Sequence, residues 1–198
     1  MVTTASPIRV GILVFDGVDE LDVVGPHRVL STWAARSALR PDVVLFSRDG
    51  LPVRSATGLD LVPSLDSNGT GTMHVLIHPG GPGARRLSRD RDHLAWLRRT
   101  RRGTALLAGL GTGSLALAAA GLLAGRATAV HPDARAALLG LEPSALLDVD
   151  SATLDDGDLL TCAGGVHGID LALAVVERYE GAPMAATVRG TLTYDPGP

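Results

Sequence analysis

One stretch constrains the fold of this chain more than any other. Residues 104–121 contain a short apolar segment, a glycine-rich turn and a segment rich in Ala and Leu. This order predicts a buried strand that turns abruptly into a helix. In α/β proteins such an elbow exposes one side chain beside the N–H groups of the helix N-terminus. A nucleophilic Cys or Ser is expected at the apex, but this sequence has Gly111 there.

Apolar runs typical of strands alternate with segments of helical periodicity along the chain. Besides the elbow, strands are expected at residues 8–15, 42–47, 73–78, 127–131, 146–150 and 158–162, with a hairpin of 51–54 and 59–62. Helices are expected at 20–36, 90–101, 132–140, 166–179 and 184–191. Pro26 requires either an early position in its helix or a break before it. The alternation predicts one α/β domain over residues 1–198, a three-layer sandwich around a doubly wound, mostly parallel sheet.

Composition limits the classes of partner. The formal net charge is only −3, so no nucleic-acid partner is expected. No apolar run is long enough to cross a membrane and the N-terminus lacks signal-peptide features, so we expect a cytoplasmic protein with no membrane partner. All 18 basic residues are Arg, which excludes a Schiff-base lysine. The single cysteine, Cys162, excludes an internal disulfide.

Reactive residues follow several of the expected strands, where parallel sheets form their ligand sites. They are Asp22, His78, Gly80, Gly81, Gly111, Thr112, His131, Cys162 and His167. Each type also has a structural interpretation: a carboxylate favouring a helix dipole, hydrogen-bonded core histidines, a small buried cysteine, or glycines in a tight turn. A metal site of Asp22 and the three histidines has no close ligand spacing, so neither a metal nor another cofactor is expected.

Several motifs, in the right order, resemble the ThiJ/PfpI superfamily and within it the isonitrile hydratase branch. The similar segments are residues 15–26, 77–83, 111–123, 127–131, 161–170 and 192–196. They include the Pro-Gly-Gly turn and the Thr-Gly start of the elbow helix, and together they cover nearly the whole chain. The resemblance implies a flavodoxin-like fold related to class I glutamine amidotransferases. It also implies a homodimer with the pocket near its interface.

The resemblance further implies roles for single residues. In the family, a cysteine at the elbow is the nucleophile, and an acid after the first strand moves protons. By resemblance Asp22 is that acid, Gly81 supplies an oxyanion donor, Thr112 lines the pocket and His131 is the nearby histidine. Gly111 departs from the pattern because it has no atom that could attack a substrate. Glycine fits an elbow because it relieves backbone strain, so a positive φ is expected there.

Three functions stay open on these grounds. The first is a small-molecule enzyme without covalent catalysis, in which Asp22 is a general acid/base and the N–H groups of Gly81 and Thr112 stabilise negative charge. Hydration, a lyase reaction or a cyclisation would fit it. The second is a non-catalytic ligand-binding protein or dimeric scaffold. The third uses Cys162 as an alternative nucleophile, although the family has Ser at the matching place.

Overall fold

A seven-stranded sheet forms the centre of the molecule, with strand order β10-β11-β7-β6-β1-β2-β5. The structure, a computed structural model, describes residues 7–195. The strands of this sheet are β1 (Arg9–Leu13), β2 (Asp42–Ser47), β5 (Leu65–Asp66), β6 (Val75–His78), β7 (Leu106–Leu110), β10 (Thr153–Asp155) and β11 (Leu159–Cys162). All neighbours pair in parallel except β10 and β11. The expected mostly parallel α/β sheet is therefore confirmed. The expected domain of 1–198 includes residues 1–6 and 196–198, which lie outside the described part.

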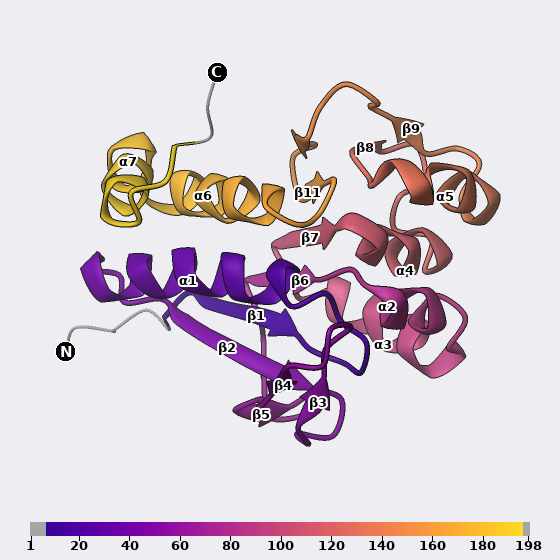
Figure 1. Ribbon diagram of the computed structural model, residues 1–198, viewed down its shortest axis with the longest axis horizontal. Coiled ribbons are helices and arrows are strands. Elements are labelled where there is room, and N and C mark those ends of the chain that lie inside the picture. The colour runs from indigo at the N-terminus through magenta and orange to yellow at the C-terminus, as the bar shows by residue number, and fades with distance from the viewer. Residues whose placement is uncertain (1–6, 196–198) are drawn as a thin grey trace.

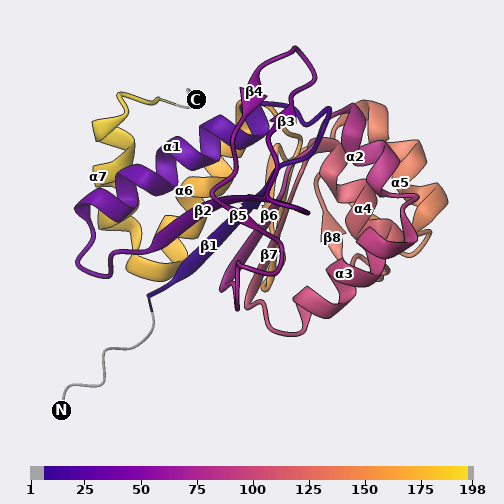
Figure 2. The same cartoon turned by 90° about the horizontal axis from the view of Figure 1, so that it is seen from below.

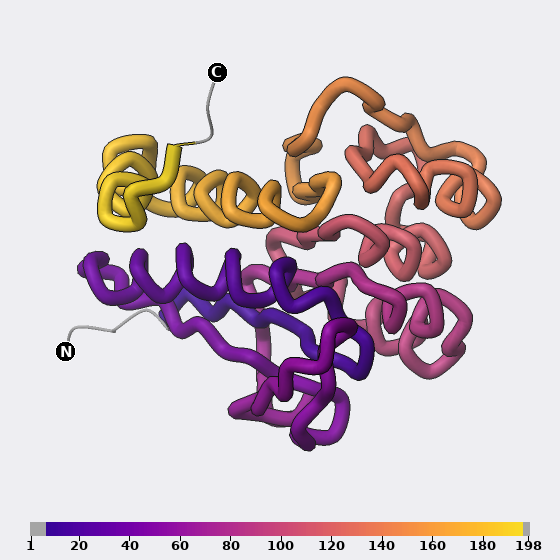
Figure 3. Tube along the Cα trace, in the orientation of Figure 1, coloured from indigo at the N-terminus to yellow at the C-terminus, as the bar shows by residue number. Residues whose placement is uncertain are grey.

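Helices cover both faces of the sheet, which makes three layers (Figure 2). One face carries α1 (Leu21–Arg36), α6 (His167–Glu180) and α7 (Ala182–Thr191). The other carries α2 (Pro82–Leu87), α3 (Arg91–Arg101), α4 (Ser114–Ala119) and α5 (Arg135–Leu141). Helices α1 and α6 lie side by side although most of the chain separates them (Figure 3). The central strands β1, β6 and β7 are almost entirely buried, as continuous apolar runs covered on both faces should be.

Two small sheets lie outside the central one (Figure 1). The hairpin of β3 (Val53–Arg54) and β4 (Asp60–Leu61) is antiparallel, as expected, but its strands are shorter. The strands expected at 127–131 and 146–150 are the short parallel pair β8 (Ala127–Thr128) and β9 (Leu146–Leu147), not part of the main sheet. Strands β5 and β10 and helix α2 were not expected, because they are short and only partly apolar.

Pro26 lies inside α1, as its sixth residue, and the helix does not break before it. The expectation of an early position or a break is therefore wrong. A proline in a helix interior costs about 3 kcal/mol because it removes one hydrogen bond and crowds the preceding turn. Packing against α6 offsets this cost: Pro26 is buried, and a Cβ on Gly168 would come within 3.3 Å of its Cγ. No helix within residues 7–195 has the length and apolarity that a membrane span needs.

Candidate active site

The strand-to-helix elbow follows β7 directly. Gly111 has a φ of 51°, in the left-handed region, so the expected positive φ is confirmed. Residues Gly111–Gly113 form a short 3₁₀ turn that leads into α4. A Cβ at Gly111 would lie 3.3 Å from the carbonyl oxygen of Ala163 and 3.5 Å from Asp22 Oδ2. The position that a nucleophile would occupy is therefore bounded by the Asp22 carboxyl group and the loop after β11.

An open pocket of about 330 Å³ lies at this elbow. Its lining residues are Asp19, Asp22, Gly81, Pro82, Arg85, Gly111, Thr112, His131, Asp133, Ala163, Gly164 and Gly165. The structure thus brings Asp22, Gly81, Thr112 and His131 together around one concavity, and their roles stay predictions. Sequence reasoning missed Asp19, Pro82, Arg85, Asp133 and the loop 163–165. The Gly164-Gly165 pair, which follows the strand at 158–162 after one alanine, was the signal for that loop.

Asp22 is held by backbone from two other parts of the chain. Its side chain, in the first turn of α1, is buried, and the residue is only 2% exposed. The Gly80 N–H donates to Oδ2 at 2.8 Å, and the Gly165 N–H donates to Oδ1 at 2.5 Å. Burial raises the pKa of Asp22 from 3.8 to about 6, although the two N–H donors lower it, and nearby Asp19 adds to the rise. Asp22 therefore changes its charge close to neutral pH.

The Gly81 N–H is not free, which corrects its expected part in an oxyanion site. It donates to Thr112 Oγ1 at 2.8 Å, and the same hydroxyl donates back to the Gly81 carbonyl at 3.1 Å. Gly81 has a φ of 110°, and a Cβ there would come within 2.4 Å of the Asp19 backbone nitrogen, so only glycine fits. The Thr112 hydroxyl thus closes the Pro-Gly-Gly turn onto the elbow.

The Thr112 N–H is the second expected oxyanion donor, and it lies beside the Asp22 carboxyl group. A Cβ at Gly80 would be 2.8 Å from Asp22 Oδ2 and 3.0 Å from the Thr112 nitrogen. Both groups therefore border the same glycine. Asp22 and Thr112 both line the elbow pocket.

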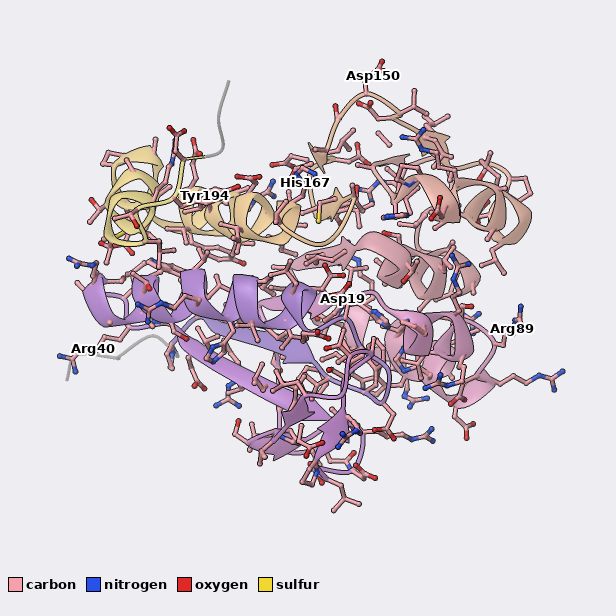
Figure 4. The ribbon with its side chains drawn as sticks, viewed as in Figure 1. Asp19, Arg40, Arg89, Asp150, His167 and Tyr194 are labelled. Atoms are coloured by element: carbon pink, nitrogen blue, oxygen red, sulfur yellow. The ribbon has the colours of Figure 1, made fainter. Side chains whose placement is uncertain are left out.

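Polar side chains outside the elbow also line the pocket, and they include Arg85, His131 and Asp133. Arg85, on α2, donates from Nη2 to the Asp133 carbonyl at 3.4 Å. The Asp133 N–H donates to His131 Nδ1 at 3.2 Å, so a neutral His131 carries its proton on Nε2. The His131 side chain is half exposed. Asp19, which also lines the pocket, lies beside the start of α1 (Figure 4). The rim can therefore bind a polar, exposed end of a ligand.

Four expected site residues do not line the pocket, and one of them, Gly80, donates its N–H to Asp22 instead. His78 is fully buried, because its ring points away from the elbow to His93, whose Nε2 is 3.0 Å from His78 Nε2. Cys162 is also fully buried, and burial raises its pKa to about 12, so the thiol is not available as a nucleophile. His167 lies at the start of α6 (Figure 4), and its Nδ1 is 3.9 Å from Asp170 Oδ2. Within residues 7–195, no three side chains of His, Cys, Asp or Glu gather as metal ligands would.

Comparison with known proteins agrees with this architecture. An isonitrile hydratase of Pseudomonas putida is 34% identical over 194 residues, which cover 96% of this chain and 80% of the hydratase. The HTH-type transcriptional regulator GbdR of Pseudomonas aeruginosa is 28% identical over 193 residues, and the chain spans 52% of its length.

Solved structures and the family pattern agree as well. A ThiJ/PfpI family protein from Pseudomonas syringae has a TM-score of 0.87 at 27% identity, covering 98% of this chain and 77% of the other. DJ-1beta of Drosophila melanogaster shares the fold, with a TM-score of 0.84 at 19% identity over 96% of this chain and 99% of its own. The pattern of the DJ-1/PfpI family matches residues 8–178. The chain belongs to the DJ-1/PfpI family.

Proposed function

We propose that the elbow pocket hydrates a small molecule by acid–base chemistry, without a covalent intermediate. The observation that carries this proposal is Asp22: a buried carboxyl group with a pKa of about 6 beside an apex that has no side chain. A general acid/base works best when its pKa is close to the working pH. Glycine at position 111 removes the nucleophile and keeps the acid.

The apex has the partners that a reacting water needs. A water oxygen placed where a Cβ on Gly111 would be lies 3.3 Å from the Ala163 carbonyl oxygen and 3.5 Å from Asp22 Oδ2. Both are acceptors, so they can take one water proton each and aim a lone pair at a substrate. Asp22 can therefore remove a proton from this water as its oxygen attacks.

Isonitriles are the substrate class with the most direct support, because the Pseudomonas putida relative is an isonitrile hydratase. Protonated Asp22 would give its proton to the terminal carbon of R–NC. The water oxygen would then bond to that carbon and return a proton to Asp22. A proton shift from oxygen to nitrogen completes the N-substituted formamide, so one water is consumed and Asp22 is regenerated.

The test is direct incubation of the wild-type protein with a panel of alkyl and aryl isonitriles. We expect formamides, detected by mass spectrometry, with a rate that falls as the pH rises above about 6 because the carboxyl group then loses its proton. A panel that is left unhydrated at pH 5 to 7 would contradict the proposal. A rate that rises through this range would contradict the role of Asp22 as the first proton donor.

A second candidate is ligand binding without turnover. Each Asp22 oxygen already accepts a backbone N–H, and the Gly81 N–H is capped by the Thr112 hydroxyl. Buried polar groups that already have backbone partners are typical of a structural site. The similarity to GbdR, a transcriptional regulator, points the same way. A small molecule that raises the unfolding temperature of the wild type and is recovered unchanged would favour this candidate.

The family resemblance also leads us to propose a homodimer. Apolar side chains of Leu21 and Val24 on α1 are 41% and 47% exposed, and Val166, next to the pocket loop, is 55% exposed. An interface over these residues would lie close to Asp22. Light scattering at micromolar concentration should give the mass of two chains, and a monomer would overturn the proposal.

A further inference from the structure

Two histidines meet in the interior on the side of the Pro-Gly-Gly turn that faces α3. His78 ends β6 and is fully buried, and His93, in the first turn of α3, is 7% exposed. Their Nε2 atoms are 3.0 Å apart, and His78 Nδ1 is 3.0 Å from the Pro79 carbonyl oxygen. Neither ring lines the elbow pocket. The pair is therefore a buried polar feature that the proposed chemistry does not use directly.

The hydrogen-bond partners determine where each proton lies. A carbonyl oxygen only accepts, so His78 Nδ1 must carry a proton and donate to Pro79. Burial lowers the pKa of His78 to about 3 and that of His93 to about 4, so both rings are neutral. His78 Nε2 is then an acceptor, and His93 Nε2 must donate to it. The chain of donors runs in one direction, from His93 to His78 to Pro79.

The Pro79 carbonyl and the Gly80 N–H belong to one peptide group. The described chain contains no cis peptide bond, so this carbonyl and this N–H point in opposite directions. The carbonyl faces His78, and the N–H therefore faces the other way, to Asp22 Oδ2 at 2.8 Å. One rigid peptide thus joins the histidine pair to the carboxyl group of the pocket.

We propose that His78, supported by His93, is a positioning residue that holds the Pro79–Gly80 peptide in the orientation that donates to Asp22. A hydrogen bond to the carbonyl also polarises the peptide, which strengthens its N–H as a donor. Because the Gly80 N–H favours the ionised carboxyl group, the pair keeps the pKa of Asp22 lower than burial alone would set it.

The surroundings of His93 fix its ring for this purpose. Its backbone N–H donates to Asp90 Oδ1 at 3.2 Å, and its ring stacks on Trp96 with centroids 5.5 Å apart. Asp90 and Arg48 are the charged groups that act on His93, whereas Asp19 is the charge that acts on Asp22. Within residues 7–195, the neighbouring His93 ring is the titratable group that acts on His78. The titration of Asp22 can therefore be measured separately from the effects of the charges near His93.

The first experiment reads the tautomers in the wild-type protein by long-range ¹⁵N–¹H NMR. We expect His78 protonated on Nδ1 and His93 on Nε2, unchanged between pH 5.5 and 8 because both rings stay neutral. A His78 ring protonated on Nε2 would overturn the proposal. This measurement needs no substrate and no variant, so a folding defect cannot obscure it.

The second experiment compares two substitutions by the ¹³C titration of the Asp22 carboxyl group. The amide nitrogen of Asn lies close to the place of histidine Nδ1, so His78→Asn keeps the donor to Pro79, whereas His78→Gln places its amide near Nε2 and removes that donor. We expect His78→Gln to raise the pKa of Asp22 by about half a unit, and His78→Asn to leave it near the wild-type value. Equal titrations in all three proteins would overturn the proposal, since a merely structural role changes only stability.

The importance of the histidine pair for turnover rests on the proposed hydration, but the two experiments on its positioning role do not. If the titration moves as expected and no isonitrile is hydrated, the positioning role stands and the proposed function fails. If hydration occurs and the titrations are equal, the proposed function stands and the positioning role fails.

Discussion

Titratable groups lie on both sides of the Pro79–Gly80 peptide, and burial shifts their pKa values in opposite directions. On the pocket side, burial raises the pKa of Asp22 to about 6. On the α3 side, burial lowers the pKa of His78 to about 3 and of His93 to about 4. Burial disfavours charge in both places. Asp22 changes its charge near neutral pH because two N–H donors partly offset that effect, whereas the histidines stay neutral over the whole physiological range.

The largest expected effect comes from removing the carboxyl group on the pocket side of the Pro79–Gly80 peptide. Asp22→Asn removes the proton-transfer group, and loss of a general acid/base costs about 10²–10⁴-fold in rate. We expect a fall of that size in kcat for isonitrile hydration. Cys162→Ser is the matched control and should leave the rate nearly unchanged, because this buried thiol lies outside the pocket. The reverse pattern, measured by steady-state kinetics, would move the chemistry to Cys162.

The second-largest expected effect tests the close approach of Gly113, in the elbow, to the Pro79–Gly80 peptide. A Cβ on Gly113 would lie 2.3 Å from the His78 carbonyl oxygen and 2.5 Å from that of Pro79. Gly113→Ala should therefore lower the free energy of unfolding by about 3 kcal/mol through overpacking. Gly190→Ala in α7 is the control, since nothing lies within 4 Å of its Cβ, and it should be neutral or slightly stabilising. Equal stabilities in urea unfolding would contradict the close approach.

The pH dependence of stability distinguishes Asp22 from the histidine pair, because their contributions to it have opposite signs. Between pH 4 and 6 the native Asp22 holds a proton that the unfolded chain has lost, so this group makes stability fall as the pH rises. Over nearly the same range the unfolded histidines hold protons that native His78 and His93 do not, so they make stability rise with pH.

Two histidine protons outweigh one carboxyl proton, so we expect stability to fall by about 1.4 kcal/mol from pH 6 to 5 from these groups. Asp22→Asn removes the opposing contribution and should make that fall about twice as steep. Urea unfolding at pH 5, 6 and 7 measures both slopes. Parallel slopes for the two proteins would show that the native pKa of Asp22 is not raised.

The smallest expected effect restores a side chain at the apex. Gly111→Cys should cost about 1 kcal/mol, because the residue must keep a positive φ. The Cβ of the new side chain would lie 3.5 Å from Asp22 Oδ2, at the pocket that Gly111 lines. Iodoacetamide should therefore modify one site in this variant and none in the native wild type, where Cys162 is buried. Mass spectrometry counts the sites, and alkylation of native Cys162 would contradict its assigned burial.

Sequence patterns located the pocket better than they described its bonding. The elbow, the Pro-Gly-Gly turn and Asp22 each follow a strand with a clear apolar run, so their meeting at one edge of a parallel sheet could be predicted. The short strands β5 and β10 carry no such run, and both were missed. The interior position of Pro26 was also missed, since its compensation comes from Gly168 on another helix.

The sequence by itself determined the alternation of strands and helices and the glycine at the apex, because periodicity and the φ preference of glycine are local properties. Tertiary structure alone decided what each polar atom contacts. Gly165 reaches Asp22 across 143 positions of the chain, and Gly81 reaches Thr112 across 31. His78 points to His93 rather than into the pocket. Such pairings depend on the order in which strands are placed in the sheet and on which face each ring takes, and neither is encoded in the neighbouring residues.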